Sequence, residues 1–267
     1  MIVRSYSIDG ISLENPMMGW IFRGPSRPLT NLNRRLLDLV IPGLPGVVRD
    51  PNSALESLEP PMPSLVVQTP RKNYSALYAL LATGSILSIT DETHREAPYE
   101  FVNATPEGFG DGDEIIDVTA TIRYPGVFWR DSAVTTPGAV VDSSPQVFDP
   151  WEMDGLVTDA VIRLRGPMTG IVLTSGRSSL RYATLPAGTY LRYDCATGKA
   201  VTTTTDTWTG GTAVDGAVSA DGPGDKFGIF PARLDPLTYV GRLSLVTETR
   251  GAGARIDVRG KAAHLAR

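Results

Sequence analysis

The stretch Ile115-Ile116-Asp117-Val118-Thr119-Ala120-Thr121-Ile122-Arg123-Tyr124 carries the clearest pattern in this sequence. Apolar and polar side chains alternate along it, so that one set is expected to share a face: Ile116, Val118, Ala120, Ile122 and Tyr124. Successive side chains of a strand point to opposite faces of a sheet. The stretch therefore predicts an antiparallel strand with one face in a core and the other in water.

The residues before this strand predict further β-structure. Asp9-Gly10 lies between two short stretches in which apolar residues alternate with serine, Ser5–Ile8 and Ile11–Leu13. This pair predicts a hairpin with a type I′ turn, because that turn needs positive φ at both central positions. Further strands are expected over 35–41, 64–69 and 85–90, and an extended, proline-rich loop over 51–63. The first of these strands must stop at Ile41-Pro42-Gly43-Leu44-Pro45-Gly46.

One helix is predicted, over Tyr74–Ala82. Apolar residues recur there at helical spacing, and Leu77 and Leu81 are four residues apart. Asn73 is expected to cap the start of the helix, and Gly84 to end it in the left-handed conformation.

The second half of the chain predicts a different domain. Residues 133–149 are rich in Thr, Ser, Gly and Pro, so we place a linker there, between a domain over 1–132 and a domain over 150–267. Eight short strands are expected beyond it, over 157–164, 170–174, 180–183, 189–193, 200–205, 226–230, 242–249 and 254–259. Such short, regularly spaced strands predict a β-sandwich of the jelly-roll type.

Composition and charge narrow the function classes. Gly and Pro make up 48 of 267 residues, or 18%, against about 12% usually, which argues against long helices and coiled coils. A net charge of −4 argues against a broad nucleic-acid-binding face. The C-terminus is locally basic through Arg250, Arg255, Arg259, Lys261 and Arg267, opposed by Asp257. This segment could bind nucleic acid or an acidic partner, but we favour the interpretation that it is an exposed last strand and tail.

The residues that usually carry chemistry are scarce. The single cysteine, Cys195, permits no internal disulfide or cysteine-based zinc site and is expected to be a small buried residue. His94 and His264 form no metal-binding motif and are expected to be solvated or locally hydrogen-bonded. The acidic run Asp111-Gly112-Asp113-Glu114 lacks the EF-hand pattern and predicts a hairpin loop. We therefore predict no catalytic, cofactor-binding or metal-binding residues, no cofactor, and no enzyme, although a glycosidase acid pair stays open.

Five aromatic residues could stack on sugar rings: Trp129, Trp151, Trp208, Tyr190 and Tyr193. Trp208 is the most suggestive, because it lies in the polar run Thr207-Trp208-Thr209-Gly210-Gly211. A packing role or a subunit contact explains this tryptophan equally well. The N-terminus shows no signal peptide and no apolar run reaches 18 residues, so we expect a soluble protein made in the cytoplasm, with no membrane partner.

In the order of its elements the chain resembles the distal tail protein, or minor tail protein, of siphovirus-type bacteriophages with long non-contractile tails. The first half matches through the hairpin at Asp9-Gly10, the turn over 41–46, the strand over 61–69, the helix over 74–82 and the strand over 115–122. In the second half, 154–160, 185–191 and Phe230-Pro231 are similar to the family's galectin-like sandwich.

The resemblance implies a mainly β protein, with a tail-tube-like N-terminal β-domain containing one α-helix and a galectin-like or jelly-roll β-sandwich. It implies a structural virion protein that forms a homohexameric ring at the phage tail tip and is assembled in the host cytoplasm. The ring would be a hub between two parts of the tail. It would join the tail tube protein to the baseplate or tail tip, where the partner is the tail-tip or tail-associated hub protein. The tape measure protein would be a further partner. DNA would only pass through the lumen. The alternative is a lectin-like protein that binds a host cell-surface glycan during adsorption.

Overall fold

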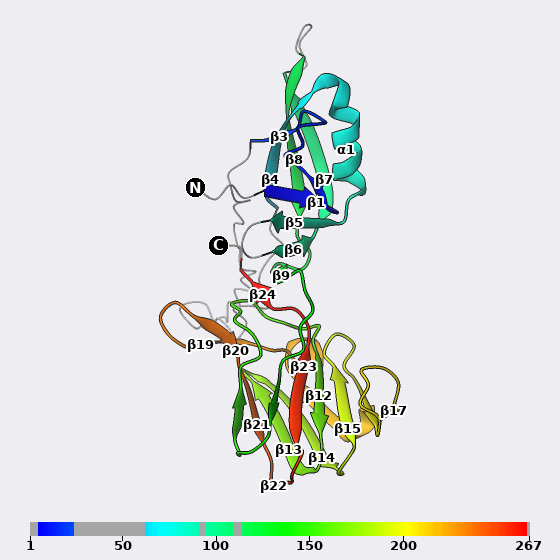
Figure 1. Ribbon diagram of the computed structural model, residues 1–267, viewed down its shortest axis with the longest axis vertical. Helices are drawn as coiled ribbons and strands as arrows, with labels where there is room; N and C mark the ends of the chain where they lie inside the picture. Colours follow the sequence, from blue (N-terminus) through cyan, green and yellow to red (C-terminus); the bar gives the residue numbers. More distant parts are fainter. Residues whose placement is uncertain (1–4, 24–61, 91–93, 109–113, 266–267) are drawn as a thin grey trace, which may run out of the picture. The chain divides into compact units, whose positions relative to one another are not determined.

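The computed structural model describes residues 5–23, 62–90, 94–108 and 114–265 and is mainly β, with one α-helix. The chain divides into two compact units, Met1–Ser132 with Leu265–Arg267, and Ala133–His264. Figure 1 shows their elements. The mainly β fold with a single helix, expected from the sequence, is confirmed.

The first unit contains two antiparallel sheets and the helix α1 (Tyr74–Thr83), which follows a short 3₁₀ turn over Arg71–Asn73. One sheet has the order β2-β1-β5-β6-β9, formed by β1 (Ser5–Ile8), β2 (Ile11–Ser12), β5 (Ile86–Thr90), β6 (Arg95–Pro98) and β9 (Trp129–Asp131). The other has the order β3-β4-β8-β7, formed by β3 (Ile21–Phe22), β4 (Ser64–Pro70), β7 (Glu100–Glu107) and β8 (Ile115–Arg123).

The strand with which the sequence analysis began is β8, and it lies inside its sheet. It pairs with β4, where Val67 lies opposite Val118, and on its other side with β7. Every second residue is fully buried: Ile116, Val118, Ala120 and Ile122. The alternation therefore places one face of β8 in the core, as predicted.

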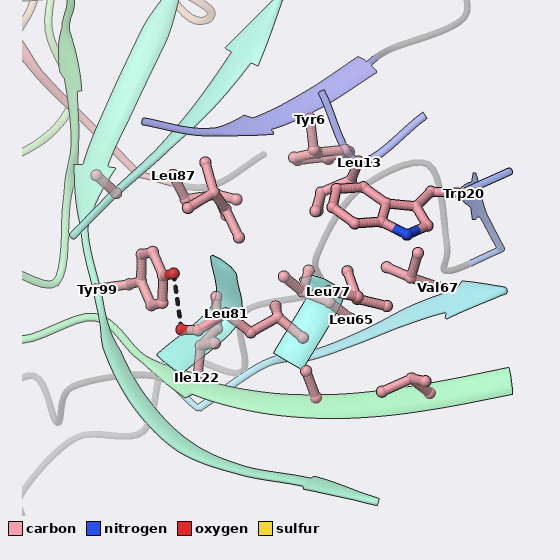
Figure 2. Close-up of a cluster of buried hydrophobic side chains, with 14 of the residues drawn as sticks. Tyr6, Leu13, Trp20, Leu65, Val67, Leu77, Leu81, Leu87, Tyr99 and Ile122 are labelled. Carbon is pink, nitrogen blue, oxygen red and sulfur yellow. Dashed lines mark hydrogen bonds between the residues drawn. The ribbon is translucent and has the colours of Figure 1, made fainter. Parts of the chain in front are cut away.

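Helix α1 adds two leucines to this core. Leu77 and Leu81 are fully buried, and Figure 2 shows both among Leu65, Val67 and Ile122. The helix ends differ from the prediction. The Asn73 side chain makes no cap and instead donates to the carbonyl of Met18 at 2.7 Å.

Gly84 follows the helix in an extended conformation, with φ of −68°, and the predicted left-handed end is wrong. Its small size is required instead by close packing. A Cβ atom at this position would lie 2.3 Å from Cγ2 of Ile8 and 2.5 Å from the hydroxyl of Tyr99.

The Asp9-Gly10 turn is confirmed, with φ of 47° and 83° at its two residues. Asp9 also joins the hairpin to the start of β5. Its carboxylate accepts hydrogen bonds from the backbone N–H of Ser85 at 3.0 Å, the Ser85 hydroxyl at 3.1 Å and the backbone N–H of Ile86 at 3.0 Å.

Replacing Asp9 with alanine is expected to lower the free energy of unfolding of the first unit by about 2 kcal/mol. The change removes charge-assisted hydrogen bonds and puts a residue with no polar side chain in the left-handed conformation. Asp9→Asn, which keeps an acceptor and tolerates positive φ, should lose less than half as much. Urea unfolding of the two variants measures the difference, and equal losses would contradict this role of Asp9.

The position of Tyr99 predicts that the free energy of unfolding of the first unit falls at alkaline pH. Burial raises the pKa of this tyrosine from 10.0 to about 12, and the Asp9 carboxylate acts in the same direction. Its hydroxyl donates to the carbonyl of Leu81 at 2.9 Å, as Figure 2 shows. Because the fold favours the neutral phenol, its contribution is full below pH 10 and is lost as the pH rises towards 12.

We therefore expect wild type to exceed Tyr99→Phe in stability by about 1 kcal/mol below pH 10, the net value of one hydrogen bond. The difference should shrink as the pH rises. Unfolding by urea over an alkaline pH series tests this, and a difference that does not change with pH would contradict it.

The second unit is a β-sandwich of two antiparallel sheets. One sheet has the order β10-β23-β12-β15-β16-β17, formed by β10 (Gly138–Val140), β12 (Val161–Arg165), β15 (Tyr190–Asp194), β16 (Lys199–Thr203), β17 (Thr212–Ala213) and β23 (Arg255–Arg259). The other has the order β11-β21-β13-β14-β18, formed by β11 (Gln146–Phe148), β13 (Met168–Ser175), β14 (Ser178–Leu185), β18 (Val218–Asp221) and β21 (Leu243–Val246).

The remaining elements of this unit are short. A separate pair is formed by β19 (Pro231–Arg233) and β20 (Tyr239–Gly241), and β22 (Thr249–Arg250) pairs with β13. Two 3₁₀ turns lie at Asp215–Ala217 and Pro223–Asp225, and β24 (Ala263–His264) is the last strand in the chain.

Three predictions for this half are wrong. The supposed linker 133–149 contributes β10 and β11, one strand to each sheet of the sandwich. Residues 226–230 form no strand, although Phe227 and Ile229 are fully buried, because Ile229 makes only an isolated bridge to Val157. The predicted exposed last strand is not exposed as a whole, since β23 lies between β10 and β12 and its three central residues are buried.

Four sequence predictions lie wholly or largely outside the described residues. They are the strand over 35–41, the Pro-Gly turn over 42–46, the loop over 51–61 and the acidic loop at 111–113. Of that acidic run only Glu114 is described, and it is exposed.

Candidate functional site

The titratable residues singled out in the sequence do not converge on a reactive centre. Cys195 is buried, as expected, and burial, with Asp194 and Asp159 nearby, raises the pKa of its thiol. A protonated thiol is a poor nucleophile. His94 is exposed and His264 is half-buried. Within the described ranges, no group of three His, Cys, Asp or Glu side chains could hold a metal ion.

No helix built from the described residues has both the length and the apolar character needed to cross a membrane.

Four of the five aromatic residues proposed as sugar platforms are buried. Trp129 lies in β9 of the first unit, whereas the other three belong to the second unit. The indole N–H of Trp151 donates to the Thr135 hydroxyl at 2.7 Å. The Tyr190 ring lies against the guanidinium groups of Arg163 and Arg165, and the Tyr193 hydroxyl accepts from the backbone N–H of Phe227 at 3.2 Å. These four rings are packing residues.

Trp208 is different, because it is only half-buried and lies in the loop between β16 and β17. The guanidinium of Arg163, in β12, lies 4.4 Å from the centre of its ring, and that of Arg259, in β23, lies 5.8 Å away. Both are cation–π distances. The indole is therefore held against arginines of the sheet.

Arg163 is the centre of this arrangement. Its side chain is 10% exposed and pairs with Asp257, which is 5% exposed, at 2.9 Å. It also pairs with Asp206, from the same loop as Trp208, whose side chain is 65% exposed. The other oxygen of Asp257 accepts from Arg255 at 2.6 Å. A buried cation is tolerated here because two carboxylates and an aromatic face surround it.

Gly138 in β10 makes room for this cluster. A Cβ atom at this position would lie 2.0 Å from Oδ1 of Asp257 and 2.7 Å from Nη2 of Arg255. The sequence analysis missed these residues, although a signal was present. Val-Ile-Arg-Leu-Arg at 161–165 and Arg-Ile-Asp-Val-Arg at 255–259 both alternate, with charged residues on one face.

The first unit presents a second candidate surface, the edge strand β7. Its eight residues lie at the end of the β3-β4-β8-β7 sheet, and no strand of the described chain pairs with its outer edge. None of its side chains is fully buried, and Val102 is 49% exposed. A register shift between Phe101 and Asn103 interrupts its pairing with β8. Such an edge offers backbone donors and acceptors to another chain.

The fold was compared with known proteins. No protein-family model matches the sequence, and the search of curated proteins also gives no match. The structure is similar to the SPP1 Dit protein, described as a paradigm of the hub adsorption apparatus in phages that infect Gram-positive bacteria. The TM-score is 0.56 at 15% sequence identity, and the match covers 97% of this chain and 99% of that one.

A chain in the activated phage P2 baseplate with Ca matches over 98% of this chain and 99% of its own length, at 12% identity and a TM-score of 0.39. The SPP1 likeness, which runs through both units, shows that the chain has the fold of a Dit protein.

Proposed function

We propose that this chain is a structural component of a phage tail, a hub that forms a ring at the distal end of the tail tube and joins it to the tail tip. The observation that carries the proposal is the likeness to the SPP1 Dit protein over 97% of the chain, through the N-terminal unit and the sandwich alike. A shared sandwich alone would support much less, because sandwiches serve many unrelated functions.

The edge strand β7 supports assembly. A ring needs a heterologous interface that closes after a fixed number of copies. An exposed edge of eight residues that stays unpaired in one chain risks open-ended association, and pairing inside a closed ring removes that risk. We propose a homohexamer, in which this edge meets the neighbouring copy.

The proposed partners follow from the place in the tail. They are the tail tube protein on one side, the tail-tip or tail-associated hub protein on the other, and the tape measure protein in the lumen. DNA is a partner only while it passes through the lumen. The net charge of −4 suits such a channel, because like charges repel and DNA would not bind to its wall. The site of action is the tail tip of the virion.

The proposal includes no catalytic role. The buried Cys195 has a raised thiol pKa, and the nearly buried charges of Arg163 and Asp257 are already paired with each other. These groups support the fold of the sandwich.

Immunogold labelling of intact phage particles tests the proposed place of the chain. Antibodies against the purified chain are expected to label the distal end of the tail, and antibodies against the tail tube protein serve as a control along its length. Label on the head, or no label on particles whose tube is labelled, would contradict the proposal.

A further inference from the structure

Five arginines lie on one face of the β10-β23-β12-β15-β16-β17 sheet. The alternation of each strand decides this, because Ile162, Leu164, Leu191, Ile256 and Val258 are buried on the core face. The residues between them point to the opposite face. We name this set the arginine face: Arg163 and Arg165 in β12, Arg192 in β15, and Arg255 and Arg259 in β23.

Aromatic rings hold three of these arginines in a row. The guanidinium of Arg165 lies 5.7 Å from the centre of the Tyr190 ring, and that of Arg163 lies 5.2 Å from the same ring. Trp208 continues the row between Arg163 and Arg259. Stacking fixes the guanidinium groups before any ligand arrives, so less side-chain entropy is lost on binding.

The face carries more positive charge than its own chain neutralises. Arg163 lies directly opposite Arg192 across β12 and β15, and Arg165 directly opposite Arg255 across β12 and β23. Like charges in such positions destabilise a sheet. Asp257 and Asp206 neutralise Arg163 and Arg255, but within the described part of the chain Arg165 and Arg259 have no ion pair.

Arg192 is also incompletely satisfied. Its Nη2 donates to the carbonyl of Gly210 at 2.9 Å, while its Nη1 is buried without a hydrogen-bond partner among the described residues. The chain as a whole has a net charge of −4, so this concentration of arginines is local.

The structure itself contains an example of what such a face binds. Asp206 lies in the bent polar loop Thr205-Asp206-Thr207-Trp208, and its exposed carboxylate pairs with the nearly buried Arg163. The arginine face therefore already holds an acidic segment of protein at one end. Arg165 and Arg259 offer the same forked donors to solvent, and this geometry matches carboxylates.

We propose that the arginine face is a docking surface for an acidic protein segment, whose carboxylates pair with Arg165 and Arg259 beside the internal pair of Asp206 and Arg163. The segment belongs to another protein, and its recognition does not depend on ring assembly. Charge complementarity gives the affinity, so binding must weaken as salt rises.

Titration calorimetry of the full chain with an oligoglutamate peptide, at about 50 mM salt where charge pairs are weakly screened, tests the proposal. Arg165→Glu and Arg259→Glu are each expected to weaken binding about tenfold, because each loses a charge-assisted contact and adds a repulsive charge. Arg181→Glu is the matched control. Arg181 is also exposed, in β14 of the other sheet, and its reversal should change affinity less than about twofold.

Asp206→Asn is expected to strengthen the binding of oligoglutamate, whereas the two arginine variants weaken it. It removes the internal competitor while it keeps the shape of the side chain, so oligoglutamate should bind several-fold more tightly. A residue with only a structural role would leave binding unchanged or weaken it. Circular dichroism of each variant checks that the sandwich is folded.

Three results would overturn the proposal. The first is that oligoglutamate shows no saturable binding, and the second is that Arg181→Glu loses as much affinity for it as Arg165→Glu and Arg259→Glu. The third is that polyphosphate binds more tightly than oligoglutamate, which would indicate a phosphate polymer as the occupant. Ring formation is scored by negative stain on the same samples. Wild type that binds oligoglutamate but forms no ring would contradict the proposed hub function alone, and rings without binding would contradict this inference alone.

Discussion

Replacing Asp257 with alanine is expected to lower the free energy of unfolding of the second unit by about 3–5 kcal/mol, the usual cost of removing one partner of a buried ion pair. The Asp257 carboxylate is 5% exposed and accepts from Arg163 at 2.9 Å and from Arg255 at 2.6 Å. Without it the nearly buried guanidinium of Arg163 keeps only Asp206, which lies at the surface.

Urea unfolding measures this loss, and hydrogen exchange of the β12 and β23 amides assigns it to the second unit. The matched control is Asp206→Ala, which removes a carboxylate from the same arginine. Because that carboxylate is 65% exposed, the control should lose less than about 1 kcal/mol. A loss in Asp206→Ala as large as that in Asp257→Ala would contradict this account of the cluster.

Replacing Leu81 with alanine should destabilise the first unit by about 2–5 kcal/mol. Leu81 is fully buried, and Figure 2 shows it between the strands and Tyr99, whose hydroxyl bonds to its carbonyl. The truncation leaves a cavity in a core that β8 and β4 hold rigid, so little of the cost can be recovered by relaxation.

Leu80→Ala is the matched control, because it removes the same atoms from the next residue of the helix. Leu80 is only partly buried against the core. It should lose less than half as much free energy of unfolding, which urea unfolding of both variants measures. Equal losses would show that helix propensity, not burial, decides the effect.

The sequence predicted those parts of the fold that local rules decide. Alternation in β8 gave its buried face, and Asp9-Gly10 gave its turn, because both depend on residues close together in the chain. Gly84 follows the helix as predicted but does not take the left-handed conformation, and its small size is required by Ile8 and Tyr99, of which Ile8 is distant in sequence. Tertiary packing decided that position.

The candidate surfaces, too, depend on contacts between residues that are distant in sequence. The sequence left Trp208 open between a sugar platform and a packing or subunit contact. Arg163 and Arg259 lie against its ring, and no local pattern gives that pairing. The basic C-terminal segment was interpreted as an exposed last strand and tail. Its strand β23 instead pairs with β10 on one side and with β12 on the other, and both partners are distant in sequence.

The central claim is that this chain assembles into a closed ring, and its mass in solution tests this most directly. We expect native mass measurement and negative-stain images of the purified chain to give a single species of six copies with six-fold symmetry. A monodisperse monomer at tens of micromolar, with no rings even when the tail tube and tail-tip proteins are added, would contradict the claim.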